Sequence, residues 1–142
     1  MQIKITRIDK TLPLPAYHTA GSVAFDFAAS ADTTIASRAL GYIPTGLIIQ
    51  APPGYMLAII ARSSLAKKHG LMLGNGVGVI DQDYCGPQDE IKLMVYNITD
   101  APVTITRGER VAQGIFLPVQ IAEWQEVDEI ASASRGGFGS TG

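Results

Sequence analysis

The chain consists of short runs of β-branched, aliphatic and aromatic residues, and each run is followed by residues that end strands. Runs of this length and composition predict β-strands. The proline, glycine and aspartate residues between them predict turns. The pattern favours an all-β sandwich or barrel, whose expected strands lie in the segments IKITRI, SVAFDFAA, YIPTGLIIQ, YMLAIIA, IKLMVYN, PVTIT and GIFLPVQIAEW.

One segment, residues 63–69 (SSLAKKH), has a different pattern. It begins with a serine that can cap a helix, continues with good helix formers and stops at Gly70. We predict one or two helical turns there.

The length of 142 residues and the 46% hydrophobic content are sufficient for one domain with its own core. We assign residues 1–130 to that domain. The tail, residues 131–142 (ASASRGGFGSTG), is dominated by small and polar residues, so it cannot bury enough surface to fold alone. We expect it to be a flexible, glycine-rich C-terminal arm.

The net charge of −2 gives no electrostatic reason to expect nucleic acid or an anionic membrane as a partner, although a small polyanion could still be held locally. Cys85 is the only cysteine, and the first ten residues lack the apolar stretch of a signal peptide. The longest apolar runs are too short to span a membrane. We therefore predict a soluble protein of a reducing compartment, the cytoplasm.

The segment GVIDQDY, residues 78–84, combines two residues that could serve chemistry. Asp81 follows three apolar residues and could act as a general base toward water. Tyr84 could place its ring against a sugar. The glycines at positions 74, 76 and 78 would allow a ligand to approach the backbone closely. A tight hairpin with Asp81 in a turn and Tyr84 on the core explains this segment equally well.

Other clusters could hold an anion or a metal. Arg62, Ser63 and Ser64 offer a guanidinium and two hydroxyls at the start of the expected helix, a combination suited to phosphate, although an ordinary helix cap with a surface arginine is the simpler interpretation. Gln113 follows two apolar residues and could donate to an anion. Strand alternation places Asp26 on the opposite face from its two phenylalanine neighbours, toward solvent or a metal site.

Five sequence motifs, in order from about Thr19 to the C-terminus, resemble those of the trimeric dUTP pyrophosphatases. The first ends in an aromatic residue and an aspartate. The second is an Arg-Ser motif, the third contains GVID between an asparagine and a tyrosine, the fourth ends in a glutamine, and the fifth is a glycine-rich tail with a phenylalanine. The matching positions are Phe25 and Asp26; residues 62–65; Asn75, residues 78–81 and Tyr84; residues 110–113; and residues 135–142.

The resemblance implies a β jelly roll that forms a homotrimer with active sites at subunit interfaces. Members of this family hydrolyse dUTP to dUMP and pyrophosphate with Mg²⁺ bound to the triphosphate. This reaction limits uracil incorporation into DNA and supplies dUMP for dTMP synthesis.

The resemblance also implies roles for individual residues. Asp81 would be the base that activates the water attacking the α-phosphorus, and Tyr84 would lie under the deoxyribose. Asp26 would reach Mg²⁺ only through water. The backbone of Gly78, Val79 and Ile80, with Asn75 and the strand position Lys92, would contact the uracil. The expected phosphate ligands are Arg62, Ser63, Ser64 and Gln113, while Phe138 of the closing tail would stack on the base and Arg135, Gly139 and Ser140 would cap the γ-phosphate.

The sequence departs from the family pattern at two places. The residues Pro87 to Asp89 are inserted before the strand that follows Tyr84, so we expect an enlarged loop or bulge there. In the tail, Arg135 directly precedes Gly136, whereas the family usually has a further glycine and one variable residue between its arginine and the GGF segment, so we expect Arg135 to enter the site from a different angle.

Outside the motifs' ligand positions, we expect Arg110 to be paired and buried at an interface, and His18 to be structural or on the surface.

Two alternative functions share this fold. A dCTP deaminase has the Arg-Ser cluster and a GVID-like hairpin, but Tyr84, the GGFGSTG tail and the short chain disfavour it. A non-catalytic, capsid-like or regulatory trimer is the other alternative, since fold does not determine function. Such a protein would not need Asp81, Arg62 and Phe138 together.

Overall fold

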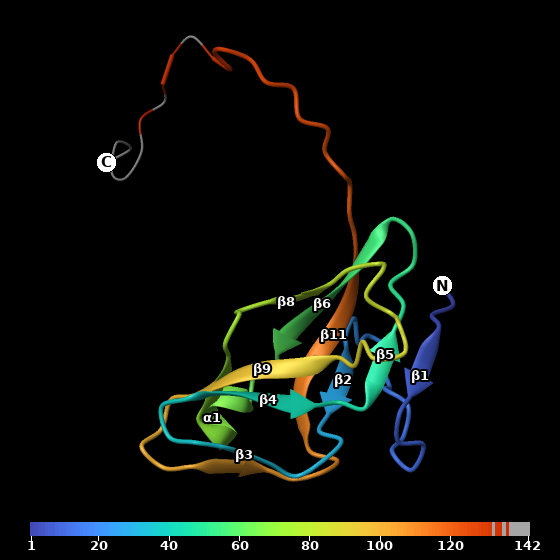
Figure 1. Ribbon diagram of the computed structural model, residues 1–142, viewed down its shortest axis with the longest axis vertical. Coiled ribbons are helices and arrows are strands. Elements are labelled where there is room, and N and C mark those ends of the chain that lie inside the picture. The colour runs from blue at the N-terminus through green and yellow to red at the C-terminus, as the bar shows by residue number, and fades with distance from the viewer. Residues whose placement is uncertain (132, 135, 137–142) are drawn as a thin grey trace.

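The computed structural model describes residues 1–131, 133–134 and 136, and nearly all of its regular structure is β-strand (Figure 1). The strands are β1 (Ile5–Arg7), β2 (Phe25–Ala28), β3 (Thr33–Ile35), β4 (Leu40–Pro44), β5 (Leu47–Ile49), β6 (Tyr55–Ala61), β7 (Leu71–Leu73), β8 (Gly78–Ile80), β9 (Lys92–Asn97), β10 (Val103–Ile105) and β11 (Arg110–Pro118). The helix α1 (Leu65–His69) lies between β6 and β7, where the sequence predicts it. The all-β prediction with one short helix is confirmed.

Two sheets form the body of the domain, and all their strand pairs are antiparallel. One sheet has the order β2-β11-β6-β8 and the other has the order β4-β9-β7. The shorter pairs β1-β5 and β3-β10 complete the structure. In Figure 1, β4 and β9 cross over β11 and β2. This arrangement is a β jelly roll.

The core lies between the two sheets because side chains alternate between the faces of each strand. On β2, Phe25 and Phe27 are buried while Asp26 points to the other face, as its position in the sequence predicts. On β9, Leu93 and Val95 are buried against them. Asp26 is therefore fixed outside the core by the strand that buries its neighbours.

The segment YIPTGLIIQ forms two strands and not the single strand that the sequence predicts. Thr45 and Gly46 separate them, and Gly46 has a φ of 67°, a left-handed conformation that glycine adopts without strain. The buried Thr45 hydroxyl donates to the carbonyl of Ile91 at 2.6 Å. This break lets β4 pair with β9 while β5 pairs with β1, so the chain leaves one sheet and joins another strand pair.

Helix α1 is held mainly at its C-terminal end. Gly70 ends it in a left-handed conformation, with its N–H donating to the carbonyl of Ala66. Ser64 occupies the cap position, but its side chain makes no capping hydrogen bond. Lys68 and His69 both contact Glu109, at 2.9 and 3.3 Å, and the hydrogen bond from Lys68 lowers the pKa of Glu109.

The long connection between β1 and β2 is fastened to the turn before β11. Arg107 contacts the Asp9 carboxylate at 2.6 Å. Hydrogen bonds from Thr11 and then Arg107 lower the pKa of Asp9 to about 2. This ion pair holds the connection against the turn before β11.

The segment that follows β11 leaves the body of the domain. The N–H of Val119 donates to the carbonyl of Gly54, and from there the chain runs outward (Figure 1). Trp124 in this segment is 94% exposed, so it does not pack in the core of its own chain. Pro118 ends the strand earlier than the apolar run does because it has no N–H to donate. Within the described residues, no helix has both the length and the apolar character needed to cross a membrane.

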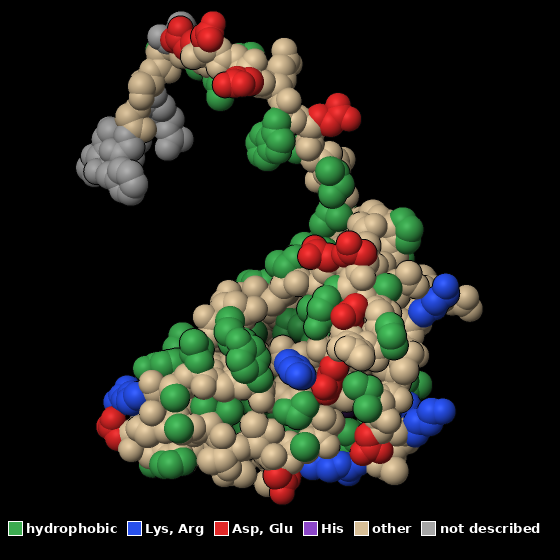
Figure 2. All heavy atoms as spheres, in the orientation of Figure 1, with side chains coloured by type: hydrophobic (Ala, Val, Ile, Leu, Met, Phe, Trp, Pro, Cys, Tyr) green, Lys and Arg blue, Asp and Glu red, His purple; other side chains and the backbone are tan. Residues whose placement is uncertain are grey.

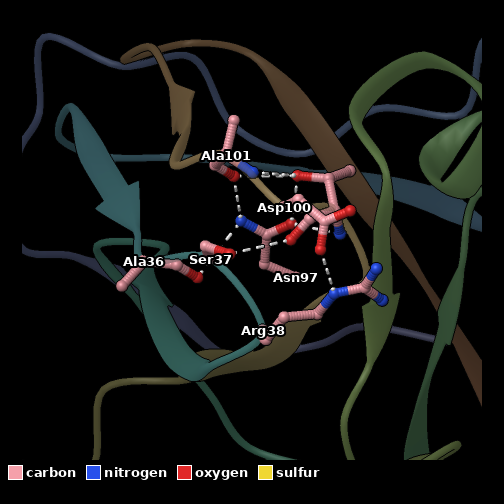
Figure 3. A network of polar contacts seen from close by, with 7 residues as sticks. Ala36, Ser37, Arg38, Asn97, Asp100 and Ala101 are labelled. Atoms are coloured by element: carbon pink, nitrogen blue, oxygen red, sulfur yellow. Dashed lines mark hydrogen bonds and ion pairs between the residues drawn. The ribbon is translucent and has the colours of Figure 1, made fainter.

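A buried amide fastens the loop between β3 and β4 to the end of β9 (Figure 3). The Asn97 side chain is fully buried, and its Nδ2 atom lies 2.8 to 3.1 Å from the carbonyl oxygens of Ile35, Ala36 and Ala101. Its Oδ1 atom accepts from the N–H and the hydroxyl of Thr99. The amide therefore provides hydrogen-bond partners for backbone groups of two segments, one at the end of β3 and one that follows β9.

Replacing Asn97 with alanine should lower the free energy of unfolding by about 3 kcal/mol, because buried carbonyl and N–H groups lose their partners. Urea unfolding of the two proteins measures this difference. Arg38→Ala is the matched control, since its ion pair with Asp100 in the same region is exposed and should contribute less than about 1 kcal/mol. An equal loss of unfolding free energy in both variants would contradict the stabilising role given to the Asn97 amide.

Candidate active site

A cavity of about 350 Å³ lies beside β8 and the loop that follows it. Its lining includes the predicted site residues Val79, Ile80, Asp81, Tyr84 and Lys92. This volume is within the range of small-molecule sites. The structure therefore brings the catalytic candidate and four of the substrate-binding candidates to one cavity.

The position of β8 at the edge of its sheet explains why its backbone is accessible. Its three residues pair with β6, Gly78 with Ile59 and Ile80 with Leu57, and no further strand follows β8 in the sheet order over the part of the chain that the structure describes. A Cβ on Gly78 would lie 3.1 Å from the Cβ of Ile59, which explains the need for glycine. The same hypothetical atom would lie 3.5 Å from the Asn75 side chain, so Asn75 is close to β8 as well.

The loop from Asp81 to Ile91 is shaped by hydrogen bonds of its own. The Tyr84 hydroxyl donates to the carbonyl of Glu90 at 3.2 Å. A turn over residues 86–89 is closed twice, by Asp89 N–H to the Gly86 carbonyl and by Gly86 N–H to the Asp89 carboxylate at 2.6 Å. Residues Pro87 to Asp89, which we expect to enlarge the loop, lie in this turn.

Asp26 is the centre of a second cluster, formed by four charged or titratable side chains. Its carboxylate contacts Arg62 Nε at 3.1 Å and Arg110 Nη1 at 3.0 Å. His18 Nε2 lies 3.1 Å from the same carboxylate and 3.0 Å from Arg110. The Asp26 side chain is only 13% exposed, so these partners surround it. Arg110 is paired, as we expect from the sequence, but its side chain is half-exposed in the single chain.

The remaining phosphate candidates lie close to this cluster. Gln113 is the direct pairing partner of Asp26 across β2 and β11, and its amide donates to the carbonyl of Ala61, the residue before Arg62. Ser63 and Ser64 follow Arg62 and are exposed. Arg62, Ser63, Ser64 and Gln113 therefore form one polar surface at the end of β6, which we call the Arg62 cluster.

The cavity and the Arg62 cluster are at opposite ends of β6. Ile80, at the cavity, is paired with Leu57, and Arg62 comes five residues later in the chain. At about 3.3 Å per residue, the two groups are separated by roughly 17 Å within one chain. The structure thus assembles the predicted residues in two groups and not in one.

Several residues of these groups are absent from the predicted set. Tyr42, Gln88 and Glu90 line the cavity, and His18 contacts Asp26. Tyr42 comes from β4 and His18 from a long loop, so only tertiary structure brings them to these places. The predicted residues Arg135, Phe138, Gly139 and Ser140 lie outside the described residues.

No group of three or more His, Cys, Asp or Glu side chains that could hold a metal ion occurs in residues 1–131, 133–134 and 136. Asp26 already has an arginine on each carboxylate oxygen. Direct coordination by Asp26 would require it to give up these contacts. The carboxylate fits an Mg²⁺ that takes its ligands from phosphate and water.

Comparison with known proteins identifies the family. A model of the dUTPase family matches residues 10–142. A deoxyuridine 5'-triphosphate nucleotidohydrolase from Shewanella sp. (strain ANA-3) is 45% identical over 147 aligned residues, which cover 100% of this chain and 95% of the relative. The protein of that name from Shewanella oneidensis is 44% identical over the same coverage.

Solved structures agree with this result. The dUTPase from Streptococcus mutans superposes with a TM-score of 0.79 and 34% identity, covering 87% of this chain and all of that one. The dUTPase of Staphylococcus bacteriophage 80alpha with dUPNHPP has a TM-score of 0.87 and 20% identity, covering 99% and 98% of the two chains, and at that identity it supports the fold alone.

The jelly roll and the similarities of sequence place the protein among the hydrolases of nucleotide metabolism. The chain belongs to the dUTPase family, and it is a dUTP diphosphatase. The alternative of a dCTP deaminase is not supported by these comparisons.

Replacing Asp26 with alanine should lower the free energy of unfolding by about 2 kcal/mol or more, because two arginines and a histidine lose a nearly buried partner. Asp100→Ala is a matched control that breaks an Asp–Arg pair with an 88% exposed carboxylate and should cost less than about 1 kcal/mol. Thermal unfolding of both variants tests this. A stability loss for Asp26→Ala no larger than that of the control would contradict the central place given to Asp26.

Proposed function

We propose that the protein hydrolyses dUTP to dUMP and pyrophosphate by attack of water on the α-phosphorus, with Asp81 as the general base. The observation that carries this proposal is the single cavity lined by Asp81, Tyr84 and the end of β8. A carboxylate at a nucleoside-sized cavity can hold a water molecule and take its proton as the oxygen attacks. The bond between the α-phosphorus and the bridging oxygen then breaks, and pyrophosphate leaves.

The nucleoside part of dUTP would occupy the cavity. The edge of β8, with Val79 and Ile80, offers backbone groups for the polar edge of uracil, and Asn75 lies close enough to Gly78 to contribute. The Tyr84 ring, held by its hydrogen bond to Glu90, would lie under the deoxyribose and leave no room for a ribose 2′-hydroxyl. Lys92, at the start of β9, completes this wall.

The Arg62 cluster would bind the triphosphate. Arginine can donate two parallel hydrogen bonds to phosphate oxygens, and serine hydroxyls and the Gln113 amide can add further donors. Asp26 holds the Arg62 guanidinium through its Nε atom, and Nη1 donates to the carbonyl of Arg110 at 3.3 Å. The guanidinium is thus oriented, and its Nη2 atom would face a ligand. Such preorganised donors are the main contribution that a protein makes to phosphoryl transfer.

We infer that each active site combines the cavity of one subunit with the Arg62 cluster of another, in a homotrimer. The α-phosphate must lie beside both Asp81 and its phosphate ligands, whereas one chain separates them by roughly 17 Å along β6. A partner is needed to close that gap.

An exposed apolar face beside the cavity supports this assembly. Leu40 and Tyr42 of β4 and Met72 of β7 are each more than half exposed, and Leu40 and Met72 both pair with Tyr96 of β9. Tyr42 also lines the cavity. Figure 2 shows hydrophobic side chains on this side of the molecule, where β4, β8 and β9 run in Figure 1. A subunit docked on this face would lie next to the cavity.

Mg²⁺ would bind to the triphosphate and reduce the negative charge of its oxygens. Asp26 would contact it only through water, because both of its oxygens already accept from arginine. The tail would close over the nucleotide, with Phe138 on the base and Arg135, Gly139 and Ser140 at the γ-phosphate. The outward course of the segment after Val119 is compatible with an arm that reaches beyond its own domain. The reaction would limit uracil incorporation into DNA and supply dUMP for dTMP synthesis.

Pyrophosphate release from dUTP, dTTP, dCTP and UTP, measured in parallel with Mg²⁺, tests the proposed specificity. Release from dUTP alone is the expected result, since the base edge excludes thymine and cytosine and Tyr84 excludes ribose. Ammonia release from dCTP would indicate a deaminase. Silence with every nucleotide would indicate a binding protein without this activity.

Replacing Asp81 with asparagine should lower kcat on dUTP by at least about a hundredfold, because an amide cannot take the proton of the attacking water. The affinity for a non-hydrolysable dUTP analogue, measured by calorimetry, should stay within a few-fold of the wild type. Asp83→Asn in the same loop is the control, since Asp83 does not line the cavity, and it should retain activity. Loss of analogue binding in Asp81→Asn would assign Asp81 a structural role instead.

A further inference from the structure

The turn over residues 86–89 places one further polar side chain at the cavity. Gln88 lines the cavity together with Asp81 and Tyr84, although no sequence motif includes it. It belongs to the segment Pro87 to Asp89 that lengthens the loop after Tyr84. Two hydrogen bonds between Gly86 and Asp89 close the turn and fix the backbone from which the Gln88 side chain extends.

The turn is rigid for three separate reasons. Pro87 fixes its own φ angle at a central position of the turn. Asp89 closes the turn with both its N–H and its carboxylate, at 3.1 and 2.6 Å from Gly86. Glu90, the next residue, is anchored by accepting from the N–H of Gly46 at 2.8 Å. The backbone of a turn held in this way loses little freedom when one of its side chains binds a ligand.

Gln88 differs from the other polar side chains of the cavity in the hydrogen bonds that it can form. Ionised Asp81 only accepts hydrogen bonds, and Lys92 only donates them. The Tyr84 hydroxyl is used by the Glu90 carbonyl, and one oxygen of the Glu90 carboxylate is used by Gly46. The Gln88 amide is exposed and can both donate and accept, as a sugar hydroxyl does.

The position of Gln88 in the loop indicates a contact with the sugar of the nucleotide and not with its base. The turn lies between Tyr84 and Glu90, whose side chain and carbonyl are joined by a hydrogen bond. The base end of the cavity is formed by β8, before this loop begins. Tyr84 is the residue assigned to the deoxyribose, and Gln88 lines the same cavity from the adjoining turn, so the sugar is the part of the nucleotide nearest to its amide.

We propose that Gln88 is a specificity-determining residue that hydrogen-bonds the 3′-hydroxyl of the deoxyribose. This inference rests on the proposed function, because it requires dUTP to occupy the cavity. The contact would favour nucleotides that carry a 3′-hydroxyl over 3′-deoxy analogues. It would do so without taking part in the chemical step.

The test compares dUTP with 2′,3′-dideoxyuridine triphosphate in wild type, Gln88→Ala and Gln88→Met. With dUTP, both variants should lose about three- to tenfold in kcat/KM, mainly through KM, as expected for one neutral hydrogen bond. With the dideoxy analogue, both variants should match the wild type, since the partner of Gln88 is absent. Gln82→Ala is the control in the same loop and should match the wild type with both substrates, because Gln82 does not line the cavity.

Three results would overturn the proposal. One is unchanged activity of both variants on dUTP. Another is an equal loss on both substrates, which would place the contact elsewhere on the nucleotide. The third is a loss in Gln88→Ala that Gln88→Met restores, because methionine has a similar length without the amide and would show that packing alone matters. Failure of the proposed function is distinct, since the wild type itself would then release no pyrophosphate from dUTP.

Discussion

The antiparallel pairing of β6 with β8 on one side and β11 on the other fixes where the cavity and the Arg62 cluster lie. The register with β8 sets Gly78 against Ile59 and brings the cavity to one end of β6. The register with β11 places Gln113 next to Ile60 and, through β2, next to Asp26 at the other end. A shift by one residue would turn each of these side chains to the opposite face. The proposed sites for the nucleoside and for the phosphates thus both depend on the register of these strands.

Asp26 illustrates how the fold converts a strand position into a functional arrangement. Phe25 and Phe27 pack in the core, and their burial forces Asp26 to the outer face of β2. There its carboxylate forms ion pairs with Arg62, at the end of β6, and with Arg110 of β11. A charge that is nearly buried is tolerated only with such partners. The core packing of two phenylalanines therefore determines the orientation of Arg62, the proposed ligand of the triphosphate.

The sequence allows much of this to be predicted, because local patterns encode local structure. Alternation places Asp26 outside the core, Gly70 ends the helix, and the runs around β2, β6, β9 and β10 are recognisable strands. The break at Thr45 and Gly46 is missed, because its cause is a partner strand and the distant Ile91 carbonyl. The short strands β3 and β7 have too few residues to show a period and exist through their pairing.

In the candidate site, too, only the residues of continuous motifs can be predicted from the sequence. Asp81 and Tyr84 can be found because their motif is continuous in the chain. Tyr42 reaches the cavity from β4, and His18 reaches Asp26 from a loop far away in sequence. No local pattern in the sequence indicates either contact. The separation of the cavity from the Arg62 cluster is likewise a consequence of register. It becomes visible only when the pairing of β6 and β8 is known.

The central claim, that one active site takes its base and its phosphate ligands from different chains, can be tested by mixing two inactive variants. Asp81→Asn and Arg62→Ala chains would be unfolded together, refolded as an equimolar mixture and assayed for pyrophosphate release from dUTP. If the site is shared, about a quarter of the sites in randomly mixed assemblies combine an intact Asp81 with an intact Arg62, and that share of wild-type activity should return. A mixture that stays as inactive as its two components would contradict the account.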